Sequence, residues 1–113
     1  MTQTLPPFPK GRPRTFRVTV HGIVFGGRDQ LLGGVHAGDE LQLVPDPPVQ
    51  EEPEVWVHLS SGQPLGHLPQ EVGEWLAPWL QRGGAARAKA LRVHGEDAPS
   101  WRRLVIEVDC HDG

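Results

Sequence analysis

Glycine and proline punctuate this chain so closely that it has room only for short secondary-structure elements. The 113 residues include 14 glycines and 12 prolines, which fall between apolar segments and form no repeat. Glycine accepts the positive φ of tight turns and proline fixes its own φ, so both residues mark connections. A chain of this length holds one small core but not two. We therefore expect a single domain of many short elements with tight connections.

Alternating apolar residues predict that most of these elements are strands. In the segment 15–25, Phe16, Val18 and Val20 share one face, as in a half-buried strand, and Gly22 marks a bend or bulge. Further alternation predicts strands at 39–44, 54–59, 64–68, 86–95 and 101–110. The glycine-rich segment 26–34 is a connection with room for one helical turn.

One clear helix is predicted after Pro69, a residue suited to the first position of a helix because its missing N–H costs nothing there. Apolar residues then recur at helical spacing, at Val72, Trp75, Leu76, Trp79 and Leu80. Pro78 ends or kinks the helix near its close. About six short strands with one main helix predict a mainly β fold, α+β in some schemes: a small antiparallel OB-like barrel plugged by the helix at one end.

The domain is predicted to span residues 15–110, between a flexible, proline-rich and basic arm at 1–14 and a tail at 111–113. A single cysteine, Cys110, permits neither an intramolecular disulfide nor a cysteine metal cage, which suits a cytoplasmic protein. No apolar run approaches the roughly 20 residues that span a bilayer. We expect a cytoplasmic protein that binds no membrane.

Charge and motifs exclude several function classes. The net charge of −3 argues against a protein that coats nucleic acid, although the arginines near Arg17 and Arg87 leave room for a local basic patch. The sequence contains no phosphate-binding loop, no nucleophile elbow and no tightly spaced His/Asp metal cluster. We therefore expect a non-catalytic module with no cofactor and no metal.

Several segments taken together resemble the HIRAN domain. They are "VHGIVFGGR" (20–28), "AGDELQLV" (37–44), a proline-rich acidic loop, "VWV" (55–57) and "GQPLGHLPQEVGEWLAPWL" (62–80). Their order and spacing carry the resemblance, which covers Thr15 to Cys110. It implies a modified OB-like barrel of the kind often fused to ATP-dependent DNA translocases or nucleases. It also implies binding of the 3′ end of single-stranded DNA through aromatic stacking, phosphate contacts and an acidic residue on the 3′ hydroxyl.

The resemblance assigns roles to individual residues. Phe25 matches an aromatic that can stack a terminal base, although core packing is the alternative for a phenylalanine at a strand end. His67 matches a residue near a phosphate, with a backbone hydrogen bond as the alternative; at the start of a helix we expect it to act as a neutral donor. Gln70 stands where the family often has a basic residue.

The acidic loop departs most from the family. Many members carry Asn-Pro-Tyr-Asp-x-Asn-Ala there, whereas this chain reads "PPVQEEPEV" (47–55). Gln50 replaces the aromatic and Glu51 is the nearest stand-in for the aspartate. Acids in this loop oppose a polyanion, so we expect weak binding.

Three further residues complete the predicted binding surface. Trp56 alternates away from the core face of its strand, so it is expected to be exposed and to stack a base or pack on a partner. Arg17 and Arg28 are candidates to line a basic groove, with an ordinary solvated strand face as the alternative.

These features favour a module that binds single-stranded DNA weakly, preferring a free 3′ end, in DNA repair or replication. One alternative is a protein-interaction module that has lost DNA binding and docks on a helicase or nuclease through its acidic loop. A degenerate fragment with only a structural role is a third alternative. The sequence does not distinguish DNA from RNA.

Overall fold

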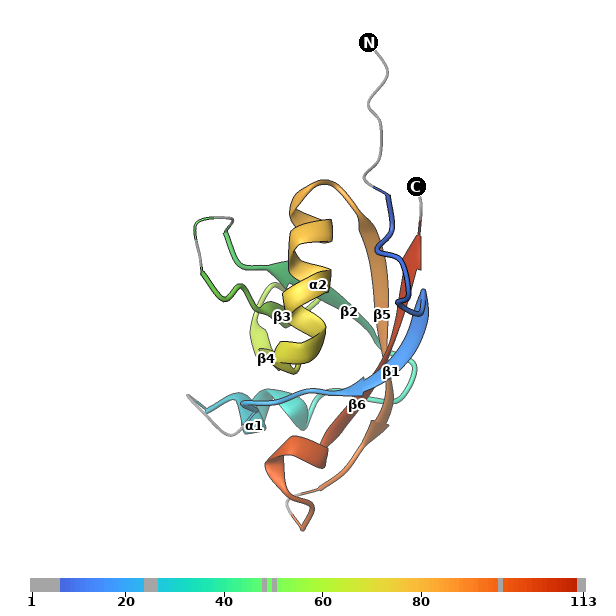
Figure 1. The fold of residues 1–113 in the computed structure, drawn as a ribbon. Helices are drawn as coiled ribbons and strands as arrows, with labels where there is room; N and C mark the ends of the chain where they lie inside the picture. Colours follow the sequence, from blue (N-terminus) through green and yellow to red (C-terminus); the bar gives the residue numbers. More distant parts are fainter. Residues whose placement is uncertain (1–6, 24–26, 48, 50, 96, 112–113) are drawn as a thin grey trace.

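A computed structural model describes residues 7–23, 27–47, 49, 51–95 and 97–111, and it shows a curled, wholly antiparallel sheet (Figure 1). Six strands form the sheet in the order β1-β6-β5-β2-β3-β4. Their bounds are β1 Thr15–Thr19, β2 Glu40–Pro45, β3 Val55–Leu59, β4 Pro64–His67, β5 Ala85–Val93 and β6 Leu104–His111. The helices are α1 Arg28–Leu32, α2 Gln70–Gln81 and the 3-10 turn η2 Ser100–Arg102. The predicted mainly β, OB-like architecture with one main helix is confirmed.

The two edges of the sheet meet at one pair of residues, His21 and His67. The backbone N–H of His21 donates to the His67 carbonyl at 2.8 Å, and the N–H of His67 donates back at 2.9 Å. Gly22 follows with φ of 76°, the left-handed conformation that favours glycine, and so makes the predicted bend. Gly66 lies on β4 beside this bridge, and a Cβ there would meet the His21 carbonyl oxygen and, at 2.7 Å, Val20 Cγ1. The closure therefore depends on a residue without a side chain.

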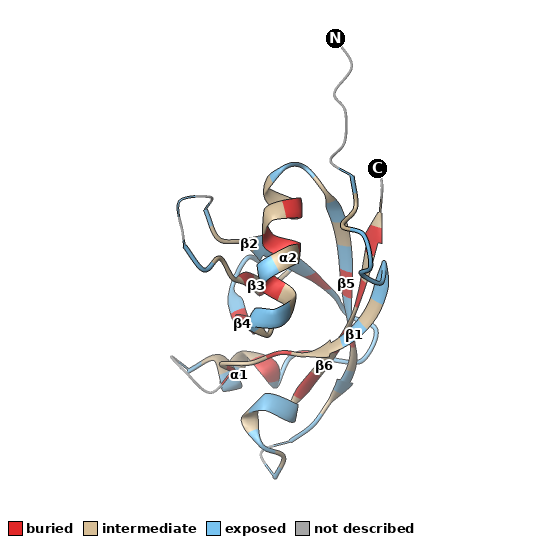
Figure 2. Ribbon diagram, in the orientation of Figure 1, coloured by how far each residue is buried: buried red, intermediate tan, exposed pale blue. Residues whose placement is uncertain are grey.

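Helix α2 covers the hollow of the sheet and completes the core. Leu76 and Trp79 are buried on its inner face, where α2 packs against β2 and β3, and the helix continues through Pro78 to Gln81. Buried and less buried positions alternate along β6 as its sequence predicts (Figure 2). No helix among the described residues is long and apolar enough to cross a membrane.

The last part of the predicted arm lies on α2. The Phe8 ring makes edge-to-face contacts with Trp75 and Trp79, at centroid distances of 5.8 Å and 5.2 Å. Arg12 and Arg14 place their guanidinium carbons 5.7 Å from the Trp75 ring and 4.7 Å from the Phe8 ring. Such contacts stabilise aromatic clusters by about 0.5–1.5 kcal/mol each. The flexibility of residues 1–14 stays a prediction, but Phe8 extends the apolar cluster of α2.

The predicted strand at 101–110 begins later than expected. Pro99 precedes the 3-10 turn that contains Trp101 and Arg102, and β6 starts only at Leu104. Arg103 Nε donates to the Ala98 carbonyl at 3.0 Å and so holds the turn. The alternation of β6 is as predicted, but Trp101 lies outside the sheet.

Cys110 near the end of β6 is a buried, protonated thiol. Burial, helped by the neighbouring Asp109 carboxylate, raises its pKa from 9.0 to about 11, while Arg14 lowers it slightly. The folded chain therefore holds this proton to higher pH than the unfolded chain does. It follows that the free energy of unfolding falls as the pH rises from about 9 to about 11. At neutral pH Cys110 acts as a small apolar core residue.

Candidate functional site

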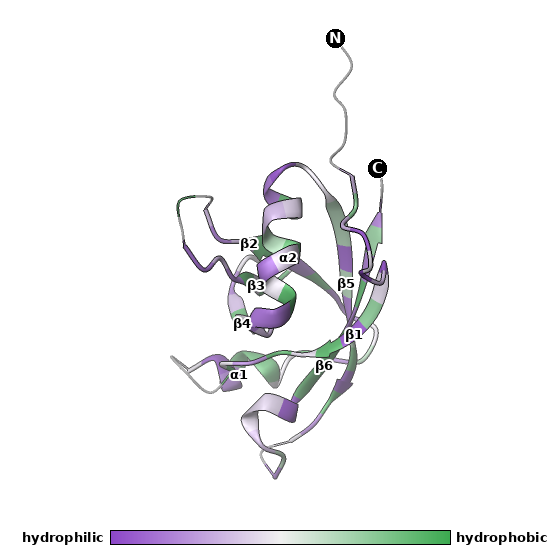
Figure 3. Cartoon of the chain, in the orientation of Figure 1, coloured by the Kyte–Doolittle hydropathy of each residue, from purple (hydrophilic) through white to green (hydrophobic). Residues whose placement is uncertain are grey.

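Trp56 is fixed on the outer side of β3 by the base of the acidic loop. Its indole Nε1 donates to Asp46 Oδ1 at 3.0 Å, and Asp46 Oδ2 accepts the Glu54 N–H at 3.0 Å. The Asp46 N–H also donates to the Glu54 carbonyl at 2.8 Å. Both ends of this loop are hydrophilic (Figure 3). The indole ring is thus half-buried and held in one orientation, rather than freely exposed as the sequence predicts.

Arg28, the first residue of α1, lies over the Trp56 ring. Its guanidinium carbon is 5.0 Å from the ring centroid, within the range of a cation–π contact. Its Nη1 donates to the Gly22 carbonyl at 3.0 Å, which anchors the guanidinium at the closure of the sheet. A guanidinium carries five N–H donors, so this group has further donors for an anion. The Arg28 guanidinium is therefore a cation held in place against the Trp56 ring.

His67 lies beside the same tryptophan at the end of β4. Its ring centroid is 5.5 Å from that of Trp56 and 6.2 Å from that of His21. Nδ1 lies 3.1 Å from the Leu68 carbonyl oxygen and 3.9 Å from Glu54 Oε1. The first contact assigns the Nδ1 proton, so that a neutral imidazole has only a lone pair at Nε2. Contrary to the sequence-based expectation, His67 donates to an anion through Nε2 only when it is protonated.

The six residues predicted from the sequence therefore divide into groups. Arg28, Trp56 and His67 come together, and we name them the Trp56 surface. Arg17 lies on the outer face of β1, where its Nε is 3.8 Å from Glu107 Oε2. Phe25 lies outside the described residues.

Glu51 lies on a different part of the surface from His67. It is exposed and lines a pocket of about 510 Å³ with Glu52, Gln70 and Glu74, between the acidic loop and α2. Glu54, which approaches His67, was missed by the sequence prediction, as were Asp46 and His21. The spacing of Glu54 and Trp56 could have indicated this role. The two residues lie two apart on an extended segment, so their side chains point to the same side of the sheet.

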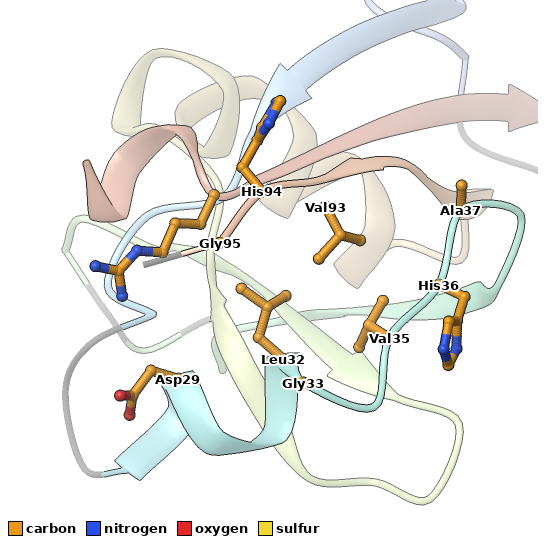
Figure 4. Close-up of a pocket in the computed structure, with 10 residues that line it drawn as sticks. Asp29, Leu32, Gly33, Val35, His36, Ala37, Val93, His94 and Gly95 are labelled. Carbon is orange, nitrogen blue, oxygen red and sulfur yellow. The ribbon is translucent and has the colours of Figure 1, made fainter. Parts of the chain in front are cut away.

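A further pocket of about 510 Å³ lies between α1 and the ends of β5 and β6 (Figure 4). Leu32, Val35 and Val93 converge on it, while Asp29 and His36 lie at its margin. None of the five described residues among those predicted from the sequence lines it. Within the described part of the chain, no group of three or more His, Cys, Asp or Glu residues is arranged to hold a metal ion.

Comparison with known proteins identifies the fold. No protein-family model matches the sequence, and no curated protein matches it significantly. The structure is similar to the crystal structure of the HIRAN domain of human HLTF, with a TM-score of 0.60 and 17% sequence identity. The similarity covers 85% of this chain and 74% of that one. The curled sheet, the closing bridge and helix α2 thus form a domain with the HIRAN fold.

Proposed function

We propose that this domain binds single-stranded nucleic acid on the Trp56 surface, and that it acts in DNA repair or replication. The observation that carries the proposal is the cation–π contact of the Arg28 guanidinium with the Trp56 ring, with His67 beside that ring. Single strands are bound where cations meet phosphates and where bases stack on flat groups, including guanidinium planes. The sequence resemblance to the HIRAN domain supports the same function.

Each residue of the surface has a separate role in this proposal. Arg28 binds a phosphate through its remaining N–H groups, and the face of its guanidinium turned away from Trp56 stacks a base. Protonated His67 donates to a second phosphate oxygen from Nε2. Trp56 does not itself stack a base on the face that Arg28 covers. It helps to hold the guanidinium in place through the cation–π contact.

Glu54 gives this surface a means of recognising a free 3′ hydroxyl. Its side chain is 38% exposed, and Oε1 lies 3.9 Å from His67 Nδ1. A carboxylate accepts a hydrogen bond from a hydroxyl but repels a terminal phosphate. In this proposal Glu54 takes the role that the family resemblance assigns to Glu51, because Glu54 is the acid next to His67.

Oligonucleotides that differ only at the 3′ end test this role. We expect fluorescence anisotropy at about 50 mM salt to show binding of a 3′-hydroxyl oligonucleotide about fivefold to tenfold tighter than its 3′-phosphate form. Glu54→Gln should lose most of this preference, whereas Glu51→Gln, the matched change in the same loop, should keep it. Equal affinities of the unmodified protein for both ends would reject end recognition. Absence of binding to either oligonucleotide at low salt would reject the proposed function.

Substitution of His67 tests its role. Glutamine keeps a hydrogen-bonding side chain but carries no positive charge, so we expect His67→Gln to weaken binding of a 3′-hydroxyl strand about threefold to tenfold. The His21 ring lies 6.2 Å from that of His67 and supplies the matched control. His21→Gln should change the affinity less than twofold. The reverse result would assign the phosphate contact to His21.

The acidic pocket supports a second candidate function, a docking site for a basic segment of a helicase or nuclease partner. Glu51, Glu52 and Glu74 all line this pocket beside Gln70. Salt-sensitive binding of a lysine-rich peptide that is lost in Glu52→Gln and Glu74→Gln, together with no binding of oligonucleotides, would favour this function over the first.

A further inference from the structure

A second basic and aromatic surface lies on the outer face of the sheet, where β1 and β5 end and β6 begins, near η2. It surrounds a pocket of about 310 Å³ whose charged side chains are Arg17, Arg92 and Arg102, with His94 beside them. Trp101 also lines the pocket and is 51% exposed, and the Arg102 guanidinium carbon lies 5.6 Å from its ring centroid. We name Arg17, Arg92, Trp101 and Arg102 the Trp101 surface.

Strand register explains why these side chains converge. Thr19 pairs with Val105 of β6, and Val105 pairs with Arg92 of β5, so the three residues form one row across the outer face. The register shifts between Ala90 and Arg92. A bulge of this kind re-aims side chains, and here both Leu91 and Arg92 line the pocket. Arg92 is therefore directed toward Trp101 by a local feature of the sheet.

The charge balance of this surface differs from that of the whole chain. Of the residues that the structure describes, three arginines line the pocket and no carboxylate does. The nearest described ion pair joins Arg17 to Glu107 at 3.8 Å, and Lys89 Nζ lies 3.8 Å from the other oxygen of the same carboxylate. The single carboxylate of Glu107 is thus shared by two cations, Arg17 and Lys89. The surface carries an excess of positive charge beside an exposed indole, which suits a polyanion with flat groups.

The Trp101 surface is connected to the Trp56 surface along β1. The His67 ring lies 6.2 Å from the His21 ring, and His21 Nε2 lies 3.3 Å from Thr19 Oγ1. Thr19 then lines the pocket with Arg17. His94 lines both this pocket and the pocket between α1 and β5. Its ring points away from Leu32, Val35 and Val93 (Figure 4). The step from His21 to Arg17 covers about 13 Å of strand, a length that several nucleotides can follow.

We propose that a single strand held at the Trp56 surface continues along the outer face of β1 to the Trp101 surface, where Trp101 stacks a base and Arg17, Arg92 and Arg102 contact phosphates. This inference rests on the proposed function and extends it, because it makes the strand length a determinant of affinity. An acidic protein segment is the alternative ligand of the Trp101 surface, and binding measurements with single strands and an acidic peptide distinguish it from nucleic acid.

Affinities for oligothymidines of three and eight nucleotides test the path. The shorter strand reaches only the Trp56 surface, so we expect the eight-nucleotide strand to bind at least tenfold tighter. Trp101→Ala should weaken the longer strand about tenfold and leave the shorter one within twofold. Trp101 is half-exposed and lies outside the sheet, so circular dichroism and the unfolding midpoint should change little. The exposed Val49 supplies a matched control in Val49→Ala, which should change neither affinity.

The salt dependence supplies an independent measurement. Each lost phosphate contact lowers the slope of log affinity against log salt by about 0.7 for a single strand. Arg92→Gln should lower the slope by about that amount for the longer strand. Arg87→Gln, an exposed change elsewhere on β5, should not.

The outcomes distinguish failure of the path from failure of the proposed function. If the Trp101 and Arg92 variants bind the longer strand as the unmodified protein does, while Arg28→Glu weakens it, the path is overturned and the Trp56 surface stands. If neither strand binds at all, both proposals fail. Binding of a glutamate-rich peptide that Trp101→Ala abolishes, with no effect of that variant on either strand, would replace the path with a protein-docking site.

Discussion

A Gly66→Ala variant is expected to lose about 3 kcal/mol or more of its free energy of unfolding. A Cβ at this position would meet the His21 carbonyl oxygen and would lie 2.7 Å from Val20 Cγ1, and the first of these is a backbone atom that cannot move aside. Overpacking of a core costs about 1–3 kcal/mol. The two backbone hydrogen bonds of the His21–His67 bridge, about 1 kcal/mol each, would be strained as well.

Urea unfolding followed by tryptophan fluorescence measures this loss. Gly34→Ala is the matched control, because a Cβ there would meet nothing closer than the Leu31 carbonyl oxygen at 3.7 Å. It should change the free energy of unfolding by no more than about 0.5 kcal/mol. A Gly66→Ala protein as stable as the Gly34→Ala protein would mean that the bridge at His21 and His67 does not constrain the sheet.

The largest effect on binding is expected from reversing the charge of Arg28. Arg28→Glu removes the proposed phosphate contact and the cation–π contact with Trp56, and it places a carboxylate on the proposed binding surface. We expect affinity for a 3′-hydroxyl oligonucleotide to fall about 100-fold at 50 mM salt. The difference should shrink at higher salt because the repulsion is screened.

Two further variants separate the contributions of charge and shape at this position. Arg28→Lys keeps the charge but lacks the planar guanidinium, so it should lose about fivefold to tenfold. Arg87→Glu, which changes the net charge equally at an exposed site on β5, should alter affinity less than twofold at high salt. Equal losses in Arg28→Glu and Arg87→Glu would indicate a general charge effect and would contradict a specific site at Trp56.

The sequence predicts the strands and the main helix well because each depends on a local period. Phe16 and Val18 face the core from β1, and Val20 follows on the same side, although β1 ends at Thr19 and is shorter than the predicted segment 15–25. The alternating pattern at 101–110 predicts that Trp101 lies in the last strand, but β6 begins only at Leu104. Pro99 and the bond from Arg103 to the Ala98 carbonyl instead turn the chain there.

The site was harder to predict because it forms where distant segments meet. The sequence indicates Arg28 and His67 separately, but their position around Trp56 depends on the bridge between residues 21 and 67, which has no local period. Glu51 was selected by its alignment with a motif, whereas the hydrogen bonds of Asp46 bring Glu54 rather than Glu51 toward His67. Contacts of this kind require the folded chain.

The hydrogen bonds at the base of the acidic loop also make that loop replaceable. Asp46 and Glu54 are joined by a backbone bond and by the Asp46 carboxylate, so β2 and β3 keep their register whatever lies between them. Loop closure depends only weakly on length once the ends are fixed. Residues 47–53 can therefore be exchanged for segments of other composition and length while Trp56 stays in place. The acidic loop is therefore a part of this domain whose sequence and length can vary without change to the barrel.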